Sequence, residues 1–176
     1  MADGGLEIER KYILAAPPGE AVLATFGRPV RIEQRYLVDG PGGTTRRLRV
    51  VQGDGPVRYV YTEKDRVGPE GPPDQGPVVH AEREEEIAAE RHASLLAQAD
   101  PAARVVVKDR WRIPVDDLVF ELDHVHEPVE LWVLEVELEH PEVRVEVPGI
   151  FGPVREDPAC SMAALARGAY PPSADR

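Results

Sequence analysis

The sequence predicts a mainly β domain, built as an antiparallel barrel or sandwich with a few helices beside it. Three observations support this fold class. Eight short runs show the two-residue alternation or the residue types of β-strands. Segments rich in glycine and proline separate these runs, as turns do in antiparallel sheets. The chain of 176 residues has the length of one domain that can bury a core or close a barrel.

The predicted strands follow one another as far as residue 139. A further stretch, 142–147, also alternates and is a weaker strand prediction. The segment 67–77 contains three glycines and four prolines, so we expect a flexible hairpin loop there. The eight main strands are predicted at 7–14, 30–38, 45–51, 57–64, 79–87, 104–114, 118–123 and 131–139.

Three helices are predicted. The first covers 17–25, where two prolines suit an opening turn, and the second covers 88–99, which is rich in alanine and leucine. The third is predicted to use Asp157 as its N-cap and Pro158 as its first residue, and to stop at Gly168. We expect a single domain over 1–170 and a flexible tail over 171–176.

Composition excludes several classes of function. The formal net charge of −11 argues against nonspecific binding to nucleic acid or to anionic membranes. The sequence has no run of apolar residues long enough to span a membrane, and its start lacks the pattern of a secretory signal. A single cysteine, Cys160, excludes an internal disulfide and fits a reducing compartment, so we expect a cytoplasmic protein.

Charged side chains of one sign recur at every second position in several of the predicted strands. Such residues share one face of a strand, so Glu7, Glu9 and Lys11 are expected on the same face. Ordinary solvent-facing strands usually mix signs and include uncharged polar residues, whereas most of these pairs are sign-pure. The other pairs are Arg47 and Arg49, Thr62 and Lys64, Glu84 and Glu86, Lys108 and Arg110, Glu121 and Asp123, and Glu135 and Glu137.

These faces predict a ligand that combines a divalent cation with a chain of phosphates. The set holds eight acids and six bases, so one divalent cation would make it neutral. Carboxylate oxygens favour hard ions such as Mg²⁺, Mn²⁺ or Ca²⁺. Arginine forks suit bidentate contact with phosphate, and lysines act as mobile point charges. For any one pair taken alone, the alternative is an ordinary strand face exposed to solvent.

The same segments, taken in order, resemble the motifs of one protein family. Glu7-x-Glu9-x-Lys11 is similar to the signature of the CYTH superfamily, also called triphosphate tunnel metalloenzymes. That motif alone is weakly specific, but eight elements in the family's order are strongly specific. The others are Gln34-Arg35-Tyr36-Leu37, Arg47-Leu48-Arg49, Thr62-Glu63-Lys64, Glu84-Glu85-Glu86-Ile87, Lys108-Asp109-Arg110, Phe120-Glu121-Leu122-Asp123 and Leu134-Glu135-Val136-Glu137.

The resemblance implies an eight-stranded antiparallel β-barrel whose charged face lines a tunnel, with flanking helices and a short C-terminal helix. Known members hydrolyse or cyclise triphosphates with Mg²⁺ or Mn²⁺. The chain looks most like the small bacterial tripolyphosphatases, so we expect metal-dependent hydrolysis of inorganic tripolyphosphate to pyrophosphate and phosphate. The alternatives are a class IV-like adenylate cyclase, a thiamine triphosphatase, and a non-catalytic protein that binds polyphosphate or a nucleotide.

The resemblance and the charge pattern together assign roles to individual residues. The expected partner is a small-molecule polyphosphate or nucleoside triphosphate, not nucleic acid or a membrane, and a homodimer is left open. Tyr36 is expected either to pack or to contact phosphate. The expected Mg²⁺ or Mn²⁺ ligands are Glu7, Glu9, Glu135 and Glu137; the residues expected to act in catalysis are Glu121, Asp123 and Lys11; and those expected to bind phosphate are Lys11, Arg47, Arg49, Lys64, Lys108 and Arg110.

One segment departs from the family pattern. Similar bacterial members usually enter the C-terminal helix with a Tyr, a Lys and an Asn, whereas this chain has the uncharged stretch 158–163. We expect this departure to affect the number of phosphates held, the rate, or how the tunnel end is closed, and to leave the metal-binding wall in place. The remaining functional residue types are assigned ordinary roles: His124 and His126 to the surface or a loop, His80, His92 and His140 to solvent, Cys160 to packing, and Trp111 and Trp132 to the barrel exterior under a helix.

Overall fold

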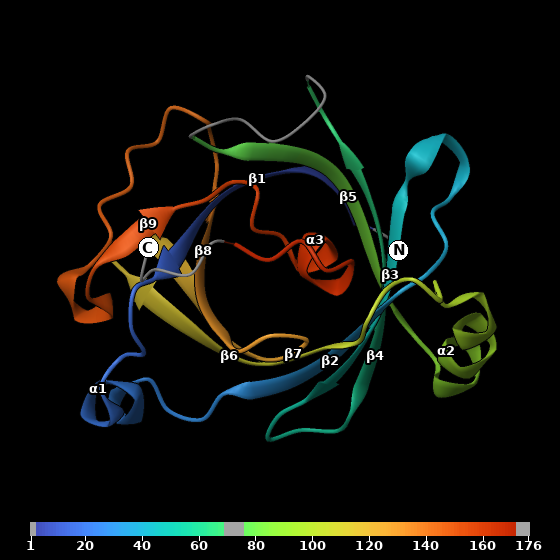
Figure 1. Cartoon of the computed structure of the whole chain (residues 1–176), viewed down its shortest axis with the longest axis horizontal. Coiled ribbons are helices and arrows are strands. Elements are labelled where there is room, and N and C mark those ends of the chain that lie inside the picture. Colours follow the sequence, from blue (N-terminus) through green and yellow to red (C-terminus); the bar gives the residue numbers. More distant parts are fainter. Residues whose placement is uncertain (1–2, 69–75, 172–176) are drawn as a thin grey trace.

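A computed structural model of the chain describes residues 3–68 and 76–171. It shows a closed antiparallel barrel of eight strands with short helices around it, which confirms the predicted fold class (Figure 1). Neighbouring strands follow the order β5-β4-β3-β2-β6-β7-β8-β1, and β1 then pairs with β5 to close the ring. The strands are β1 Asp3–Leu14, β2 Val30–Tyr36, β3 Thr45–Gln52, β4 Arg58–Arg66, β5 Val78–Ile87, β6 Val106–Val115, β7 Leu118–Glu127 and β8 Leu131–Leu138.

The long first strand closes the barrel because it pairs on both sides. Along one side it pairs with β8, with Glu9 opposite Glu137 and Lys11 opposite Glu135. Along the other side its first half pairs with β5. Its last three residues pair with the short strand β9, Val154–Glu156, which the sequence did not predict. The first and last of the eight barrel strands therefore lie side by side.

The main hydrophobic core lies outside the barrel wall. Outward-facing residues such as Tyr12, Trp111 and Leu134 form the largest buried apolar cluster. Partly buried residues of helix α1 (Glu20–Thr25) and of the segment after β8 pack against it. A second outer cluster includes Leu48 and Ile87. Residues of helix α2 (Ala89–Leu95) and of the 3₁₀ turn Leu96–Gln98 pack against this one. Apolar burial on the outside leaves the inner face free for charged side chains.

Helix α3, Met162–Ala166, lies within the ring of strands and fills part of its interior (Figure 1). Its residues Met162 and Leu165 are buried against inward-facing Ile13, Val125 and Val133. Cys160 belongs to the same buried cluster, as expected for a packing residue. The barrel interior therefore contains an apolar region around α3 beside its polar part.

All eight main strand predictions are confirmed, with ends shifted by a few residues. The stretch 142–147 is not a strand: Val143, Val145 and Val147 pack on the outer cluster, so burial without a partner strand explains its alternation. Residues 69–75 of the predicted loop and 172–176 of the predicted tail lie outside the described residues. No helix among the described residues is both long and apolar enough to cross a membrane.

The predicted start of the third helix is wrong. Asp157 accepts a hydrogen bond from the backbone N–H of Cys160 at 3.1 Å and so closes a turn that precedes the helix. The N-cap is Ser161, whose hydroxyl accepts from the N–H of Ala164 at 3.1 Å. The predicted stop is confirmed, because Gly168 follows the helix with a φ of +85°, a value that favours glycine.

Candidate active site in the barrel interior

A polar cavity of about 1000 Å³ occupies the barrel interior. Every predicted site residue lines it except Asp123. The alternation of each strand explains this, because the charged set faces inward while the apolar set packs on the outer wall. The structure thus brings together residues that are up to about 130 positions apart in the chain, from Glu7 to Glu137.

The charges divide the cavity wall into two halves. Four adjacent strands, β7, β8, β1 and β5, carry inward-facing carboxylates, and we call them the acidic half. The other four, β6, β2, β3 and β4, carry the inward-facing arginines and most of the lysines, and we call them the basic half. The acidic residues that line the cavity include Glu7, Glu9, Glu82, Glu84, Glu121, Glu135 and Glu137, and the basic ones include Arg47, Arg49, Lys64, Lys108 and Arg110.

Lys11 is a cation placed within the acidic half. Its ammonium group lies 2.9 Å from Glu9 Oε2 and 2.9 Å from Glu135 Oε1. Burial disfavours its charge, but these two carboxylates outweigh burial and raise its pKa. The other oxygen of Glu135 accepts from Arg110 at 2.8 Å. Both oxygens of Glu135 are therefore engaged by cations, which also hold its pKa well below the ordinary value against the effect of burial.

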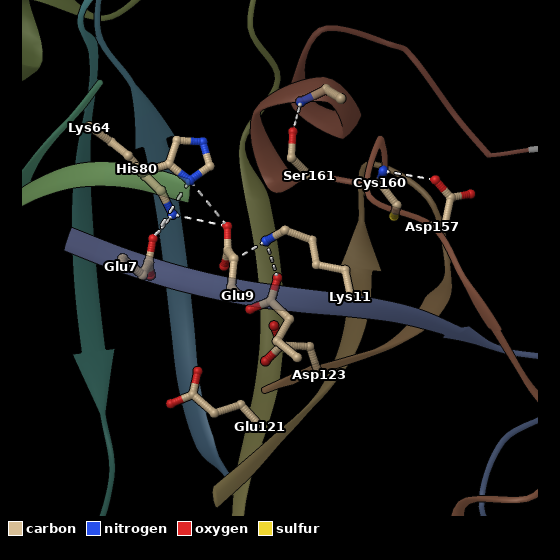
Figure 2. A network of polar contacts seen from close by, with 12 residues as sticks. Glu7, Glu9, Lys11, Lys64, His80, Glu121, Asp123, Asp157, Cys160 and Ser161 are labelled. Atoms are coloured by element: carbon tan, nitrogen blue, oxygen red, sulfur yellow. Dashed lines mark hydrogen bonds and ion pairs between the residues drawn. The ribbon is translucent and has the colours of Figure 1, made fainter. Parts of the chain in front are cut away.

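Glu7, Glu9 and His80 form a compact group where β1 pairs with β5 (Figure 2). His80 Nδ1 lies 3.5 Å from Glu9 Oε1 and 3.9 Å from Glu7 Oε2. It is buried and has no hydrogen-bond partner among the described residues. Lys64 reaches the group from the basic half and pairs with both glutamates. One metal ion could be shared by these three side chains.

The protonation of this group reflects crowding of like charges. Burial, and then the charge of Glu9, raise the pKa of Glu7 to about 7. Burial, and then Lys64, lower the pKa of His80 to about 4, so its imidazole is neutral at pH 7. Glu137 behaves like Glu7, since burial and the nearby glutamates 121, 82 and 9 raise its pKa. Lys11 and Lys64 instead lower the pKa of Glu9 against the effect of burial, so the uncompensated negative charge of the acidic half lies at Glu7 and Glu137.

The basic half holds uncompensated positive charge at two of its residues, Arg49 and Lys108. Burial, and then Arg47, lower the pKa of Arg49. Burial, and then Arg110, lower the pKa of Lys108 to about 8. Two ion pairs that join the basic half to the acidic half compensate part of this positive charge: Arg49 with Glu84, and Arg110 with Glu121. The arginine pair of β3 and the cations of β6 converge on the cavity, an arrangement suited to a bound polyanion.

Asp123 and Glu121 come from the same strand but occupy different positions. Asp123 faces the barrel interior but is fully buried beneath two cations that line the cavity: it lies 2.6 Å from Lys108 Nζ and in a bidentate contact with Arg110. Both its oxygens are used to hold these two cations. Glu121 lines the cavity and lies apart from the Glu7–Glu9 group (Figure 2). Of the two, only Glu121 has a carboxylate that reaches the cavity.

The cavity also borders on helix α3. Ser161, Met162 and Ala163 line it there and bring no charge, as the sequence indicated. Tyr36 is buried, accepts a hydrogen bond from Gln34 at 2.6 Å, and also lines the cavity. Its ring therefore packs while its hydroxyl group is part of a polar network.

Two residues that line the cavity, His80 and Glu82, were not predicted as site residues from the sequence. His80 was expected in solvent, which is wrong: its side chain is 17% exposed and faces the cavity. Glu82 also lines the cavity, two positions before the predicted Glu84, whereas Glu86 is exposed and does not. The alternation of β5 could have revealed both, because 80, 82 and 84 share one face. His92 is likewise buried, against Tyr59, while His140 is exposed as expected.

Solved structures of two proteins illustrate the similarity of this barrel to known folds. The inorganic triphosphatase NE1496 matches with 25% identity and a TM-score of 0.53, over 92% of this chain and 95% of that one. A second structure of NE1496, described as a hypothetical protein, gives 27% identity and the same TM-score over 92% and 98%. PH1819 from Pyrococcus horikoshii OT3 matches with 18% identity and a TM-score of 0.54, over 77% and 80%. It shows the fold alone.

These matches support a CYTH-like fold for the chain. No protein-family model matches the sequence, and the comparison with curated proteins gives no match either.

Proposed function

We propose that this protein is a metal-dependent hydrolase of triphosphates, and that its substrate is inorganic tripolyphosphate. The observation that carries the proposal is the division of one cavity into an acidic and a basic half. Such a wall fits a ligand that is a polyanion on one side and its counter-cation on the other. The similarity to the inorganic triphosphatase NE1496 supports the same reaction class.

The residues of the acidic half fit a divalent cation. Glu7 and Glu137 are crowded carboxylates with too little positive charge around them, and His80 adds a ring nitrogen without a hydrogen-bond partner among the described residues. Glu9 lies beside Glu7, and Lys11 and Lys64 lower its pKa against the effect of burial, so it is an ionised carboxylate. We assign the ion to these four residues. When bound, Mg²⁺ or Mn²⁺ supplies Lewis-acid polarisation of phosphoryl oxygens. The nitrogen donor favours Mn²⁺ over Mg²⁺, because Mg²⁺ prefers oxygen ligands and retains its water.

Glu135 and Asp123 take positioning roles in this proposal. Glu135, predicted as a metal ligand, has both oxygens engaged by Lys11 and Arg110. Asp123, predicted to act in catalysis, lies buried beneath Lys108 and Arg110 and fixes both cations. Both carboxylates thus keep buried cations charged and aimed at the cavity, which an unpaired cation in this environment could not achieve without cost.

The basic half holds the phosphates. Arg47, Arg49 and Arg110 present planar forks that can each contact two phosphate oxygens, and Lys64 and Lys108 add mobile charges. Water attacks the terminal phosphorus, the bond from that phosphorus to the bridging oxygen breaks, and Glu121 accepts the proton of the water. The arginines offset the charge that develops on the departing pyrophosphate. No protein nucleophile is required.

A second function, binding without turnover, is favoured by one observation. The helix that borders the cavity contributes only Ser161, Met162 and Ala163, so its share of positive charge is absent. A protein with this departure could hold polyphosphate or a nucleotide in the basic half without aligning it for attack.

The test is phosphate release from tripolyphosphate, thiamine triphosphate and ATP, each with Mg²⁺, Mn²⁺ or EDTA, with cyclic AMP measured in parallel. Fast release from tripolyphosphate that EDTA abolishes supports the proposal. Cyclic AMP from ATP would assign a cyclase instead. Tight tripolyphosphate binding with no turnover under any condition would assign the binding function.

A further inference from the structure

A cluster of metal-binding side chains lies on the outer face of the barrel, away from the cavity. Asp109 of β6 is the cross-strand partner of His124 on β7. His126 lies two residues further along β7, at an irregularity of the β6–β7 register, and 4.1 Å separates its ring centroid from that of His124, so both histidines lie on this face. The inward-facing residues between and before them, Val125 and Asp123, point the opposite way. The barrel wall therefore separates this cluster from the candidate active site.

We propose that Asp109, His124 and His126 form a second metal site, selective for a borderline ion of the Zn²⁺ class. One donor atom of each residue lies within 4.8 Å of the other two. The closest pair, His126 Nε2 and Asp109 Oδ2, is 2.8 Å apart. Donors on a tetrahedral Zn²⁺ with bonds near 2.0–2.1 Å are separated by about 3.3 Å, so small side-chain rotations bring all three to one ion.

The surroundings of the cluster supply a fourth donor and fix the other three. Glu130 Oε1 lies 3.3 Å from His124 Nε2 and can complete the coordination, or leave that position to water. Arg31 donates to Asp109 Oδ1 at 3.1 Å, which leaves Oδ2 directed at His126. The ring of His124 stacks on Trp132, with 4.1 Å between centroids and 8° between planes. These contacts hold the ligands in place before an ion arrives.

The donor types separate this site from the one in the cavity. Two imidazoles and one carboxylate suit Zn²⁺, Ni²⁺ or Co²⁺, whereas the cavity offers mainly carboxylates and suits harder ions. A bound ion would also join β6 to β7 from outside. Those strands carry Lys108, Arg110 and Glu121 on their inner faces, so the ion would stabilise the backbone that positions them.

The stacked Trp132 provides a direct readout. We would titrate the untagged chain with Ni²⁺, and separately with Zn²⁺, in excess Mg²⁺ that occupies the cavity. Ni²⁺ bound at His124 quenches tryptophan fluorescence because the indole lies against its ligand ring. Zn²⁺ is followed by calorimetry and by the thermal unfolding temperature. The expected result is one site per chain, with quenching by Ni²⁺ and an increase in the unfolding temperature with Zn²⁺.

Four variants decide the outcome. His126→Ala and Asp109→Asn should each weaken Zn²⁺ binding by at least about tenfold, and tripolyphosphate hydrolysis of His126→Ala in Mg²⁺ should equal that of the wild type. The matched control is His140→Ala, which removes an exposed imidazole elsewhere and should bind Zn²⁺ normally. Unchanged binding by His126→Ala would overturn the proposal. So would binding that is lost only in Glu9→Gln, which would place the ion in the cavity.

Discussion

The acidic and basic halves of the cavity wall carry opposite charges, yet each shows the same kind of imbalance. In the acidic half, burial and neighbouring carboxylates raise the pKa of Glu7 and Glu137. In the basic half, burial and neighbouring cations lower the pKa of Arg49 and Lys108. Ion pairs between the two halves, and the pair of Lys11 with Glu9, compensate only part of the excess charge in each half. Each half is therefore arranged for a ligand of the other sign.

The stability of the fold alone does not account for this charged interior. A core of paired charges gives little net stability, because desolvation offsets the attraction between the charges. This protein buries its larger apolar clusters outside the wall and around α3, and those clusters can stabilise the barrel. The stability from these clusters can offset the electrostatic free energy that is lost when like charges lie close together in the interior. Changes in one half should affect cation binding, and changes in the other half should affect phosphate binding.

The largest effect is expected from Glu9→Gln in the acidic half. This change keeps the size of the side chain but removes the carboxylate shared by the Glu7–His80 group and Lys11. Metal-dependent tripolyphosphate hydrolysis should fall by at least about a hundredfold, measured as phosphate release against Mn²⁺ concentration. The control is Glu33→Gln, an exposed carboxylate on the outer face of β2. Wild-type turnover by Glu9→Gln would disprove the ligand assignment.

A somewhat smaller effect is expected from Arg49→Gln in the basic half. It removes one fork directed at the phosphates and should raise KM for tripolyphosphate about ten- to a hundredfold, the range for losing a charge-assisted hydrogen bond. Metal binding in the absence of substrate should not weaken, because Arg49 belongs to the other half. Isothermal titration with Mn²⁺ and steady-state kinetics measure the two effects. Arg35→Gln, which removes an exposed arginine on the outside of β2, is the control. If Arg49→Gln lowers Mn²⁺ affinity as much as Glu9→Gln does, the two halves do not act separately.

Two residues of the acidic half should give stability opposite dependences on pH. The pKa of Glu7 rises from 4.5 to about 7 on folding, so the folded chain binds more protons and stability falls as pH rises between those values. The pKa of His80 falls from 6.5 to about 4, so the unfolded chain binds more protons and stability rises with pH over that window. The two contributions nearly cancel in the wild type.

Single variants should expose each contribution in urea unfolding with EDTA. Relative to the wild type, Glu7→Gln should gain stability as pH rises from 4.5 to 7. His80→Asn should lose stability as pH rises from 4 to 6.5. Each difference should amount to roughly 1 to 3 kcal/mol. Parallel curves for both variants would show that these groups do not titrate as a crowded pair.

The sequence contained most of the barrel and most of its charged lining. Alternation predicted which side chains of β1, β3, β6 and β8 share a face. The order of the motifs along the chain indicated that the strands close into a barrel. The sequence could not show that Asp123 is covered while Glu121 is not, because both have the same parity on β7. His80 shares the parity of Glu82 and Glu84, so alternation places it on the inner face, but alternation does not show that its ring lies beside Glu7 and Glu9. Such differences depend on depth along the barrel axis, which alternation does not encode.

The smallest effect is expected where α3 meets the cavity, beyond the end of both halves. Ala163 lines the cavity and contributes no charge, so Ala163→Lys adds a cation beside the basic half. One exposed or half-buried charge contributes up to about 1 kcal/mol, so KM for tripolyphosphate should fall about two- to fivefold while Mn²⁺ affinity stays constant. Ala163→Gln, nearly as long but uncharged, separates charge from bulk. If both variants raise KM equally, this position limits space, and the missing charge of α3 does not explain how the cavity grips its ligand.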